Sequence, residues 1–416
     1  MKHPSLQDPG SGSRLADHWS LDPTIAFLNH GAFGACPRAV LDVQQRFRQQ
    51  LEQEPLRFFR SEYEPLLDTA RHALAEFVGA DAADLVFVPN ATTGANCVLR
   101  SLYDCDNPAL AFGPEDELLT TNHAYNACRN ALEFVAQRSG AKVVVATIPF
   151  PLASVDQVIE AVLACISPRT KLALLDHITS PTALILPIQT LVQELAARGI
   201  DTLVDGAHAP GMVPLDLQAI GAAYYTGNCH KWLCAPKGAG FLYVRPDRQE
   251  AIRPLTISHG ANALRRDRTR FQLEFDWTGT QDPSPYLCVP AALQTLATFA
   301  PSGWTEIMAQ NRAVALEARG ILCTALDQPS PCPEDLIGAI AAIPLPDSFG
   351  PPVLTESGID PVQTCLWEQF QIEVPIIPWF HPPRKLVRIS AQRYNHIEQY
   401  RFLAQVLSNG NLGQFI

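Results

Sequence analysis

The sequence has few of the features that mark membrane or nucleic-acid-binding proteins. Its polar first twenty residues contain no apolar signal core. No apolar run approaches the ~20 residues of a membrane-spanning helix. The net charge is −11, without a long Lys/Arg run, which excludes the usual basic footprint of a nucleic-acid-binding protein. We therefore expect a cytoplasmic protein whose partners are small molecules, with neither a membrane nor a nucleic acid among them.

The cysteines follow no pairing or metal-binding pattern. There are eleven, an odd number, scattered along 416 residues without a CxxC pair. This favours reduced thiols in a cytoplasm over a disulfide framework or a structural zinc site, and we expect no bound metal. Because 47% of the residues are hydrophobic and 18% charged, the chain can bury a large core in two or three domains.

Short apolar runs alternate with helical patterns between residues 60 and 245. Helices are predicted at 154–166, at 188–199 and at 61–79, where Ser61 and Glu64 have capping-box spacing and Gly79 ends the segment. The apolar runs lack polar alternation, as strands covered on both faces do. They lie at 84–89, 117–121, 142–148, 170–176, 201–205 and 238–244. This order predicts an α/β fold with a mostly parallel sheet.

The pattern changes after residue 250. Residues 259–287 are predicted to form a long irregular connection, followed by a helix at 305–326, a proline-rich stretch, a strand around "LVRIS" and a final helix. We interpret this part as a smaller α+β domain. The predicted division is an N-terminal extension (1–25), a large domain (26–280) and a small C-terminal domain (281–416).

Polar residues follow the predicted strands, where ligands of parallel sheets bind. Thr92 and Thr93, near a helix start beside Gly94, favour a phosphate cradle, although an ordinary threonine cap has the same pattern. Asp205 could face a cationic ring nitrogen or be a satisfied structural carboxylate. The glycine fingerprint of a dinucleotide site is missing.

Three further residues extend this set. Lys231, between His230 and Trp232, is either a buried amine that forms an imine with a carbonyl or an ordinary lysine reaching solvent. His123 could stack on an aromatic ring ligand, and Arg388 in an apolar strand could bind a carboxylate. Phosphate cradle, ring partner, imine lysine and carboxylate clamp together are the parts that pyridoxal 5'-phosphate needs.

Longer motifs carry a family resemblance. "VDGAHAPG" and "YYTGNCHKWLCAPKGAGFLYV" resemble the class V aminotransferases, pyridoxal-phosphate enzymes of fold type I. "FLNHGAFGACP", "EFDWTGTQDPSPYL" and "RISAQRYN" are similar to the isopenicillin N epimerase-like branch. The resemblance implies a large domain with a mostly parallel sheet, a smaller C-terminal domain and a homodimer.

The resemblance also implies a role for each matching residue. Lys231 would bind the cofactor covalently, Asp205 would face the ring nitrogen, and His123 would stack on the ring. The other implied cofactor contacts are His208 near the ring hydroxyl and, at the phosphate, Thr92 or Thr93, Asn228, His230 and Thr280 of the neighbouring subunit. The implied substrate contacts are Arg388, Asn29 and His30.

Two departures bear on the reaction. The stretch "IEVPIIPWFHPPRKLVR" lacks the cysteine of persulfide-forming desulfurases, and "HITSPTA" lacks the usual asparagine, leaving Ser180 or Thr179 as substitutes. We therefore expect an enzyme acting on an amino acid or a related substrate through a cofactor imine, with epimerisation or racemisation as the expected outcome. C–S lysis (of cysteine or a hercynylcysteine-sulfoxide type) or transamination are alternatives. A non-catalytic regulator would need a DNA-binding domain, for which the N-terminal segment is too short.

Overall fold

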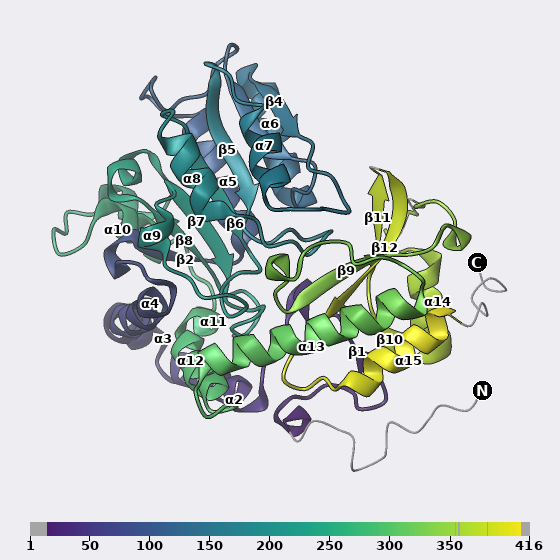
Figure 1. The fold of residues 1–416 in the computed structure, drawn as a ribbon. Helices are drawn as coiled ribbons and strands as arrows, with labels where there is room; N and C mark the ends of the chain where they lie inside the picture. The colour runs from purple at the N-terminus through teal and green to yellow at the C-terminus, as the bar shows by residue number, and fades with distance from the viewer. Residues whose placement is uncertain (1–14, 354, 357, 381, 409–416) are drawn as a thin grey trace.

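The protein has two lobes, each built on its own β-sheet (Figure 1). The computed structural model describes residues 15–353, 355–356, 358–380 and 382–408; most of the predicted extension 1–25 lies outside these ranges. The long helix α13 (Trp304–Ala325) runs alongside both lobes. Of the helices in the described ranges, none combines the length and apolarity that crossing a bilayer requires.

The larger lobe contains a seven-stranded sheet in the order β2-β8-β7-β6-β5-β3-β4. Only β8 runs antiparallel to its neighbours, so the predicted mostly parallel sheet is confirmed. The strands are β2 (Leu85–Val88), β3 (Glu117–Thr121), β4 (Lys142–Ala146), β5 (Thr170–Asp176), β6 (Asp201–Gly206), β7 (Tyr224–Asn228) and β8 (Gly240–Val244). The sequence analysis missed β7, because its Thr, Gly and Asn residues interrupt the apolar pattern.

Helices cover both faces of this sheet. Alternate residues of the central strands pack into two separate apolar clusters: Leu174 and Leu203 contribute to one, and Leu175 and Val204 to the other. Burial on both faces explains why the strands show no polar alternation. The flanking helices are α5 (Ala91–Tyr103), α6 (Asn126–Ser139), α7 (Asp156–Leu163), α8 (Ile188–Ala196) and α9 (Leu217–Ile220).

The helix predicted at 61–79 begins differently from expectation. Helix α2 (Arg38–Gln53) leads through α3 (Pro55–Arg57) and a π-helical turn, Phe58–Glu62, directly into α4 (Tyr63–Val78). The predicted capping box was therefore wrong. The chain is already helical at Ser61, so there is no helix N-terminus whose N–H groups the Ser61 side chain would cap. The predicted end is confirmed, since Gly79 has φ 65°, which glycine adopts most readily.

The predicted irregular connection 259–287 contains two short helices, which corrects that prediction. These are α10 (Arg270–Asp276) and α11 (Ser284–Leu287), and α12 (Val289–Ala297) follows. Helix α10 belongs to the larger lobe, where Phe271 and Phe275 are buried against the sheet cluster. Its seven residues are too few to show a clear helical period, which is why the sequence did not reveal it.

The smaller lobe contains an antiparallel sheet in the order β11-β12-β9. A second, two-stranded sheet joins β1, near the chain start, in parallel to β10. The division at 280/281 stays a prediction, and this pairing shows that the start of the proposed large domain contacts the smaller lobe. The elements are α1 (His30–Phe33), β1 (Ala26–Phe27), β9 (Ile340–Pro344), α14 (Pro361–Phe370), β10 (Ile372–Glu373), β11 (Ile376–Phe380), β12 (Pro383–Ser390) and α15 (Ile397–Ser408).

Candidate active site

A cavity of about 580 Å³ lies where the parallel strands of the large sheet end. We call it the strand-end cavity. Its walls come from the segments after β2, β5, β6 and β7 and from helix α1, which brings segments distant in sequence together. The lining residues are Ala32, Phe33, Pro89, Asn90, Ala91, Thr92, Thr93, Tyr125, Asp176, Ile178, Ser180, Asp205, Ala207, His208, Asn228, His230, Lys231 and Gly238.

One end of the cavity is the first turn of α5. Asn90 is the N-cap, since its side chain accepts a hydrogen bond from the backbone N–H of Thr93 at 2.9 Å. Thr92 and Thr93 therefore lie on the first turn, where N–H groups and the helix dipole favour an anion. Gly94 lets this turn approach β7, because a Cβ there would lie 2.1 Å from Oγ1 of Thr226.

Asn228 and His230 complete this end. The Asn228 side chain accepts a hydrogen bond from the Ala91 N–H at 2.8 Å, which fixes the helix start against β7. Nδ1 of His230 bonds the carbonyl of Ala239 at 3.0 Å, so Nδ1 is the protonated nitrogen of the neutral ring. Burial lowers the pKa of His230 to about 4, which keeps that ring neutral near pH 7.

Lys231 is the cavity's only lysine among its lining residues, and it is buried. Burial, assisted by the positive charge of Arg388, lowers its pKa to about 8. Nζ lies 3.1 Å from Nε2 of His208, and the Trp232 indole donates to Nδ1 of His208 at 3.4 Å. Because burial also lowers the pKa of His208 well below its usual value, that ring carries one proton. Because Nδ1 accepts from Trp232, the proton of His208 is on Nε2, from which it can donate to Lys231 whenever that amine is neutral.

His30 supports Lys231 from behind the cavity. Nε2 of His30 lies 3.1 Å from the carbonyl oxygen of Lys231, and Nδ1 lies 2.7 Å from the Tyr394 hydroxyl. His30 is fully buried, and Asn29 contacts Glu373 at 3.4 Å. Asn29 and His30 are not among the residues that line the strand-end cavity, and their role on the substrate side stays a prediction. Two later residues of the segment, Ala32 and Phe33, lie there instead.

Asp205 lies in the cavity wall with both carboxylate oxygens satisfied. Oδ1 accepts from the Ala207 N–H at 3.0 Å, and Oδ2 accepts from the Cys128 thiol at 3.0 Å. A second buried carboxyl, Asp176, lines the same wall. The sequence analysis missed Asp176, although its position at the end of a predicted strand was the same signal that identified Asp205.

The aromatic ring beside the cavity is that of Tyr125, not that of His123. His123 is fully buried, with Nδ1 2.6 Å from Oγ1 of Thr182 and Nε2 3.1 Å from the Ile148 carbonyl, and it does not line the cavity. Its ring packs 4.6 Å from that of Trp379. The stacking role of His123 stays a prediction. Tyr125, two residues later and 43% exposed, is the residue the sequence analysis missed.

Arg388 contacts the strand-end cavity indirectly, by hydrogen bonds to Ser180, which lines it. Its Nη1 donates to the carbonyl of Ser180 at 2.6 Å and to the Ser180 hydroxyl at 3.0 Å, while Nε is buried without a hydrogen bond. Ser180 lines the cavity, whereas Thr179 is buried and bonded to Thr182. Of the two predicted substitutes for asparagine, the structure thus brings Ser180 to the site.

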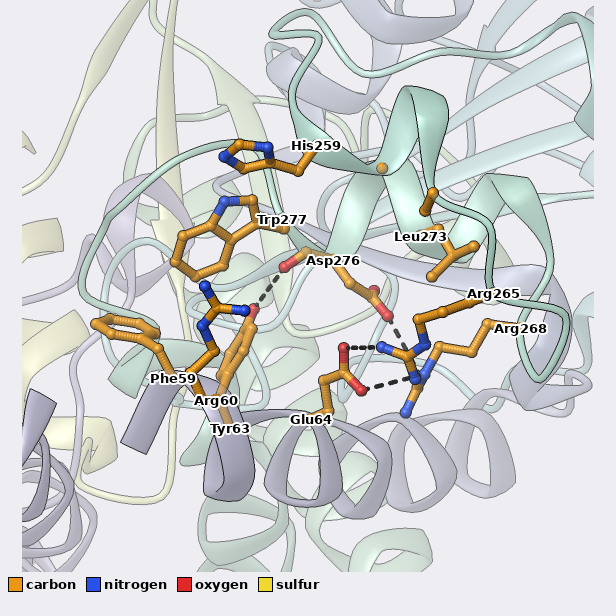
Figure 2. A pocket seen from close by; sticks show the side chains of 12 residues that line it. Phe59, Arg60, Tyr63, Glu64, His259, Arg265, Arg268, Leu273, Asp276 and Trp277 are labelled. Atoms are coloured by element: carbon orange, nitrogen blue, oxygen red, sulfur yellow. Dashed lines mark hydrogen bonds and ion pairs between the residues drawn. The ribbon is translucent and has the colours of Figure 1, made fainter. Parts of the chain in front are cut away.

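Thr280 does not line the strand-end cavity of its own chain and is exposed. It follows a second cavity, of about 530 Å³, between the segment around α4 and the segment before and within α10 (Figure 2). Ion pairs hold these walls together. Nη1 of Arg265 lies 2.6 Å from Oε1 of Glu64, and Nη2 of Arg71 donates to Oδ1 and Oδ2 of Asp276 at 2.8 and 2.7 Å. This network attaches the segment preceding Thr280 firmly to α4.

The donor set of the strand-end cavity matches pyridoxal phosphate. The α5 end offers threonine hydroxyls and helix N–H groups to a phosphate, Asp205 offers a carboxylate to a ring nitrogen, and Lys231 offers a neutral amine to an aldehyde. Tyr125 supplies an aromatic face. Fold and site together define a pyridoxal-phosphate-dependent enzyme of fold type I.

Comparisons with known proteins agree. Residues 26–278 match the family model "Aminotransferase class-V". Isopenicillin N epimerase of Amycolatopsis lactamdurans is 35% identical over 400 residues, covering 93% of this chain and 96% of that protein. The probable chloroplastic L-cysteine desulfhydrase of Arabidopsis thaliana is 31% identical over 431 residues, covering 98% of this chain and 88% of that protein. The chain belongs to the class V aminotransferase family, and its cofactor is pyridoxal phosphate.

Solved structures show the same fold. The cystine C–S lyase C-DES, in complex with its product cysteine persulfide, superposes with a TM-score of 0.73 at 22% identity, covering 92% of this chain and 97% of that one. The cysteine desulfurase CsdA of Escherichia coli gives a TM-score of 0.73 at 19% identity, covering 97% and 98%. At these identities the likeness concerns the fold alone.

Proposed function

We propose that this enzyme epimerises or racemises an amino-acid-type substrate by moving its Cα proton with Lys231. The observation that carries the proposal is the buried Lys231 amine, which is held beside His208 with a lowered pKa in a cavity whose described lining includes no thiol. The similarity to isopenicillin N epimerases over more than nine-tenths of the chain supports it.

Each part of the cavity has a proposed task in binding. The first turn of α5, with Thr92 and Thr93, and the residues Asn228 and His230 hold the phosphate, while Asp205 pairs with the ring nitrogen. Arg388, with a second nitrogen left over after its bonds to Ser180, binds the substrate carboxylate. The bound cofactor withdraws electrons from Cα and so weakens the Cα–H bond.

Lys231 then acts as the base. In its neutral form its Nζ takes the Cα proton, and the lowered pKa of about 8 makes that form far more abundant near neutral pH than in an ordinary lysine. His208 orients the amine through Nε2 and stays neutral itself. A proton delivered from solvent to the opposite face of Cα inverts the centre, and return of the proton from Lys231 to the same face gives back the substrate.

Persulfide chemistry on the enzyme does not suit this site. The cysteines nearest to Lys231 in sequence, Cys229 and Cys234, are fully buried, and burial raises their thiol pKa values. Cys128 is also buried, and burial together with the charge of Asp205 raises its pKa well above its usual value. A buried thiol with a raised pKa is a poor nucleophile.

C–S lysis is the second candidate. Several relatives are described as L-cysteine desulfhydrases, including one at 31% identity over 98% of this chain. Loss of sulfide from Cβ after removal of the Cα proton needs the same Lys231 and no enzyme thiol, so the cavity serves both reactions.

The proposal is tested by offering amino acids to the purified holoenzyme in deuterium oxide. Mass spectrometry follows deuterium at Cα, chiral chromatography follows inversion, and sulfide and keto acids are measured in parallel. Deuterium uptake with inversion supports epimerisation, whereas stoichiometric sulfide and pyruvate from cysteine establish the lyase. Alanine formation from cysteine that a single cysteine substitution abolishes would overturn both.

We also propose that the enzyme is a homodimer in which Thr280 reaches the phosphate site of the neighbouring subunit. The exposed Thr280 on an anchored segment and the exposed Phe33 (73%) at the cavity support this. If Thr280→Ala alone is inactive, mixing it with Lys231→Ala subunits restores part of the activity. No recovery under verified subunit exchange would refute the arrangement. The eleven free cysteines favour a cytoplasmic, reducing location.

A further inference from the structure

Two neighbouring strands of the large sheet place acidic residues opposite each other. Asp176 at the end of β5 and Asp205 near the end of β6 are register partners in the parallel pair. Register partners point to the same face of a sheet, and both side chains are buried, with 2% and 3% exposed. Both also line the strand-end cavity. Two ionised carboxylates this close in a buried site would repel each other strongly.

The contacts of Asp176 show how this repulsion is avoided. Oδ2 accepts a hydrogen bond from the backbone N–H of Tyr125 at 3.1 Å, and Oδ1 is buried without a partner. Burial, followed by the charge of Asp205, raises the pKa of Asp176 well above its usual value. Asp176 therefore keeps a proton, and because Oδ2 is an acceptor, the proton is on Oδ1.

The surrounding groups are consistent with a neutral Asp176. The charge of Asp205 on β6 raises the pKa of Asp176, Cys128 on α6 stays a thiol that donates to Asp205, and Lys231 after β7, when protonated, acts in the opposite direction. Asp205 already accepts from Ala207 and Cys128. These two donors favour Asp205 as the ionised member of the Asp176–Asp205 pair.

We propose that Asp176 is a neutral positioning residue at the ring end of the cofactor site. It holds the backbone of Tyr125, so that the Tyr125 ring faces the cavity, and it leaves Asp205 as the single negative charge there. This inference rests on the proposed role of Asp205 at the ring nitrogen. A single charge matters because a second ionised carboxylate would add to the negative field around an already anionic cofactor.

The test compares three variants of the holoenzyme. Asp176→Asn keeps the shape and both hydrogen-bonding functions without an ionisable proton, Asp176→Ala removes them, and Asp205→Asn removes the proposed charged partner. The readouts are the cofactor dissociation constant and the visible absorption band of the bound cofactor between pH 6 and 10. Far-ultraviolet circular dichroism checks the fold.

We expect Asp176→Asn to bind the cofactor within about threefold of the wild type, and Asp176→Ala to bind about tenfold more weakly, because the Tyr125 N–H loses its acceptor. We also expect Asp176→Asn to keep the wild-type pH dependence of the absorption band between pH 6 and 10, because a neutral Asp176 contributes no change of charge there. Asp205→Asn binds more weakly than Asp176→Asn.

Two results would overturn the inference. One is a folded Asp176→Asn protein that loses the cofactor as severely as Asp205→Asn, since the charge of Asp176 would then be required. The other is a folded Asp176→Asn protein whose absorption band titrates differently from that of the wild type between pH 6 and 10, since Asp176 would then be changing its charge in that range. Both comparisons hold even if Asp176→Ala fails to fold. A wild-type protein without any visible band would instead refute the cofactor role of the whole site, which separates the two failures.

Discussion

The lowered pKa of Lys231 predicts how fast the apoenzyme captures its cofactor at different pH values. Only a neutral amine attacks an aldehyde, so the capture rate follows the neutral fraction of Lys231. With a pKa of about 8, about one-tenth of the lysines are neutral at pH 7 and half at pH 8. With the ordinary value of 10.5, only about one in 3000 would be neutral at pH 7.

The sign and size of the effect follow from these fractions. Because the pKa is lowered, the neutral fraction rises as the pH rises through about 8 and then levels off. Capture should therefore accelerate about fivefold from pH 7 to pH 8 and hardly at all from pH 9 to pH 10. An unperturbed lysine would instead gain about tenfold per pH unit up to pH 10, from a rate about 300-fold lower at pH 7.

Stopped-flow absorbance after mixing apoenzyme with pyridoxal phosphate measures this rate. A parallel series with a small free amine corrects for the cofactor's own titration. Lys237→Ala is the matched lysine control, since Nζ of Lys237 donates to the Gly34 carbonyl at 2.9 Å outside the strand-end cavity. Lys231→Ala should show no covalent capture. A rate that keeps rising tenfold per unit through pH 9, or borohydride reduction that labels Lys237, would refute the reasoning.

Three further substitutions test the site and its frame. Arg388→Lys loses the planar fork, so KM for the substrate should rise about 10- to 100-fold with a smaller change in kcat; an unchanged KM would remove Arg388 from the carboxylate site. Gly94→Ala places a Cβ against Thr226 and should weaken cofactor binding at least tenfold, with partial recovery in the Gly94→Ala/Thr226→Ala double variant; no recovery would contradict the steric explanation. Asp276→Ala leaves the buried Arg71 guanidinium without its carboxylate partner and should lower the free energy of unfolding by about 3–5 kcal/mol, as measured with denaturant. Asp276→Asn should lower it by less, because the amide still accepts a hydrogen bond. Equal losses in the two variants would show that the charge of Asp276 is not the cause.

Much of the candidate site could be predicted from the sequence, because the last residues of parallel strands lie at the same edge of the sheet. Local features singled out Asp205 and Lys231, a carboxylate ending an apolar strand and a lysine within an apolar stretch, and the family resemblance then implied their roles. The same logic would have found Asp176, whose strand also ends in aspartate. It did not find Tyr125, because nothing in a local pattern says which of two aromatic side chains near a strand end turns toward the cavity.

Other features depended on contacts that no local pattern contains. His123, Asn29 and His30 matched family motifs, yet they are turned into the protein by Thr182, Glu373 and Tyr394, which lie between 59 and 364 residues away in sequence.

The sequence by itself determined the alternation of strand and helix and the mostly parallel sheet, since these follow from apolar periodicity along short stretches, and it singled out Lys231 as the candidate lysine for the cofactor. Only the tertiary structure decided which side chains face the cavity and which amine and carboxyl groups are neutral there. The direction in which a side chain points and its protonation state depend on burial and on neighbours that folding brings together, and a linear sequence pattern contains no information on either.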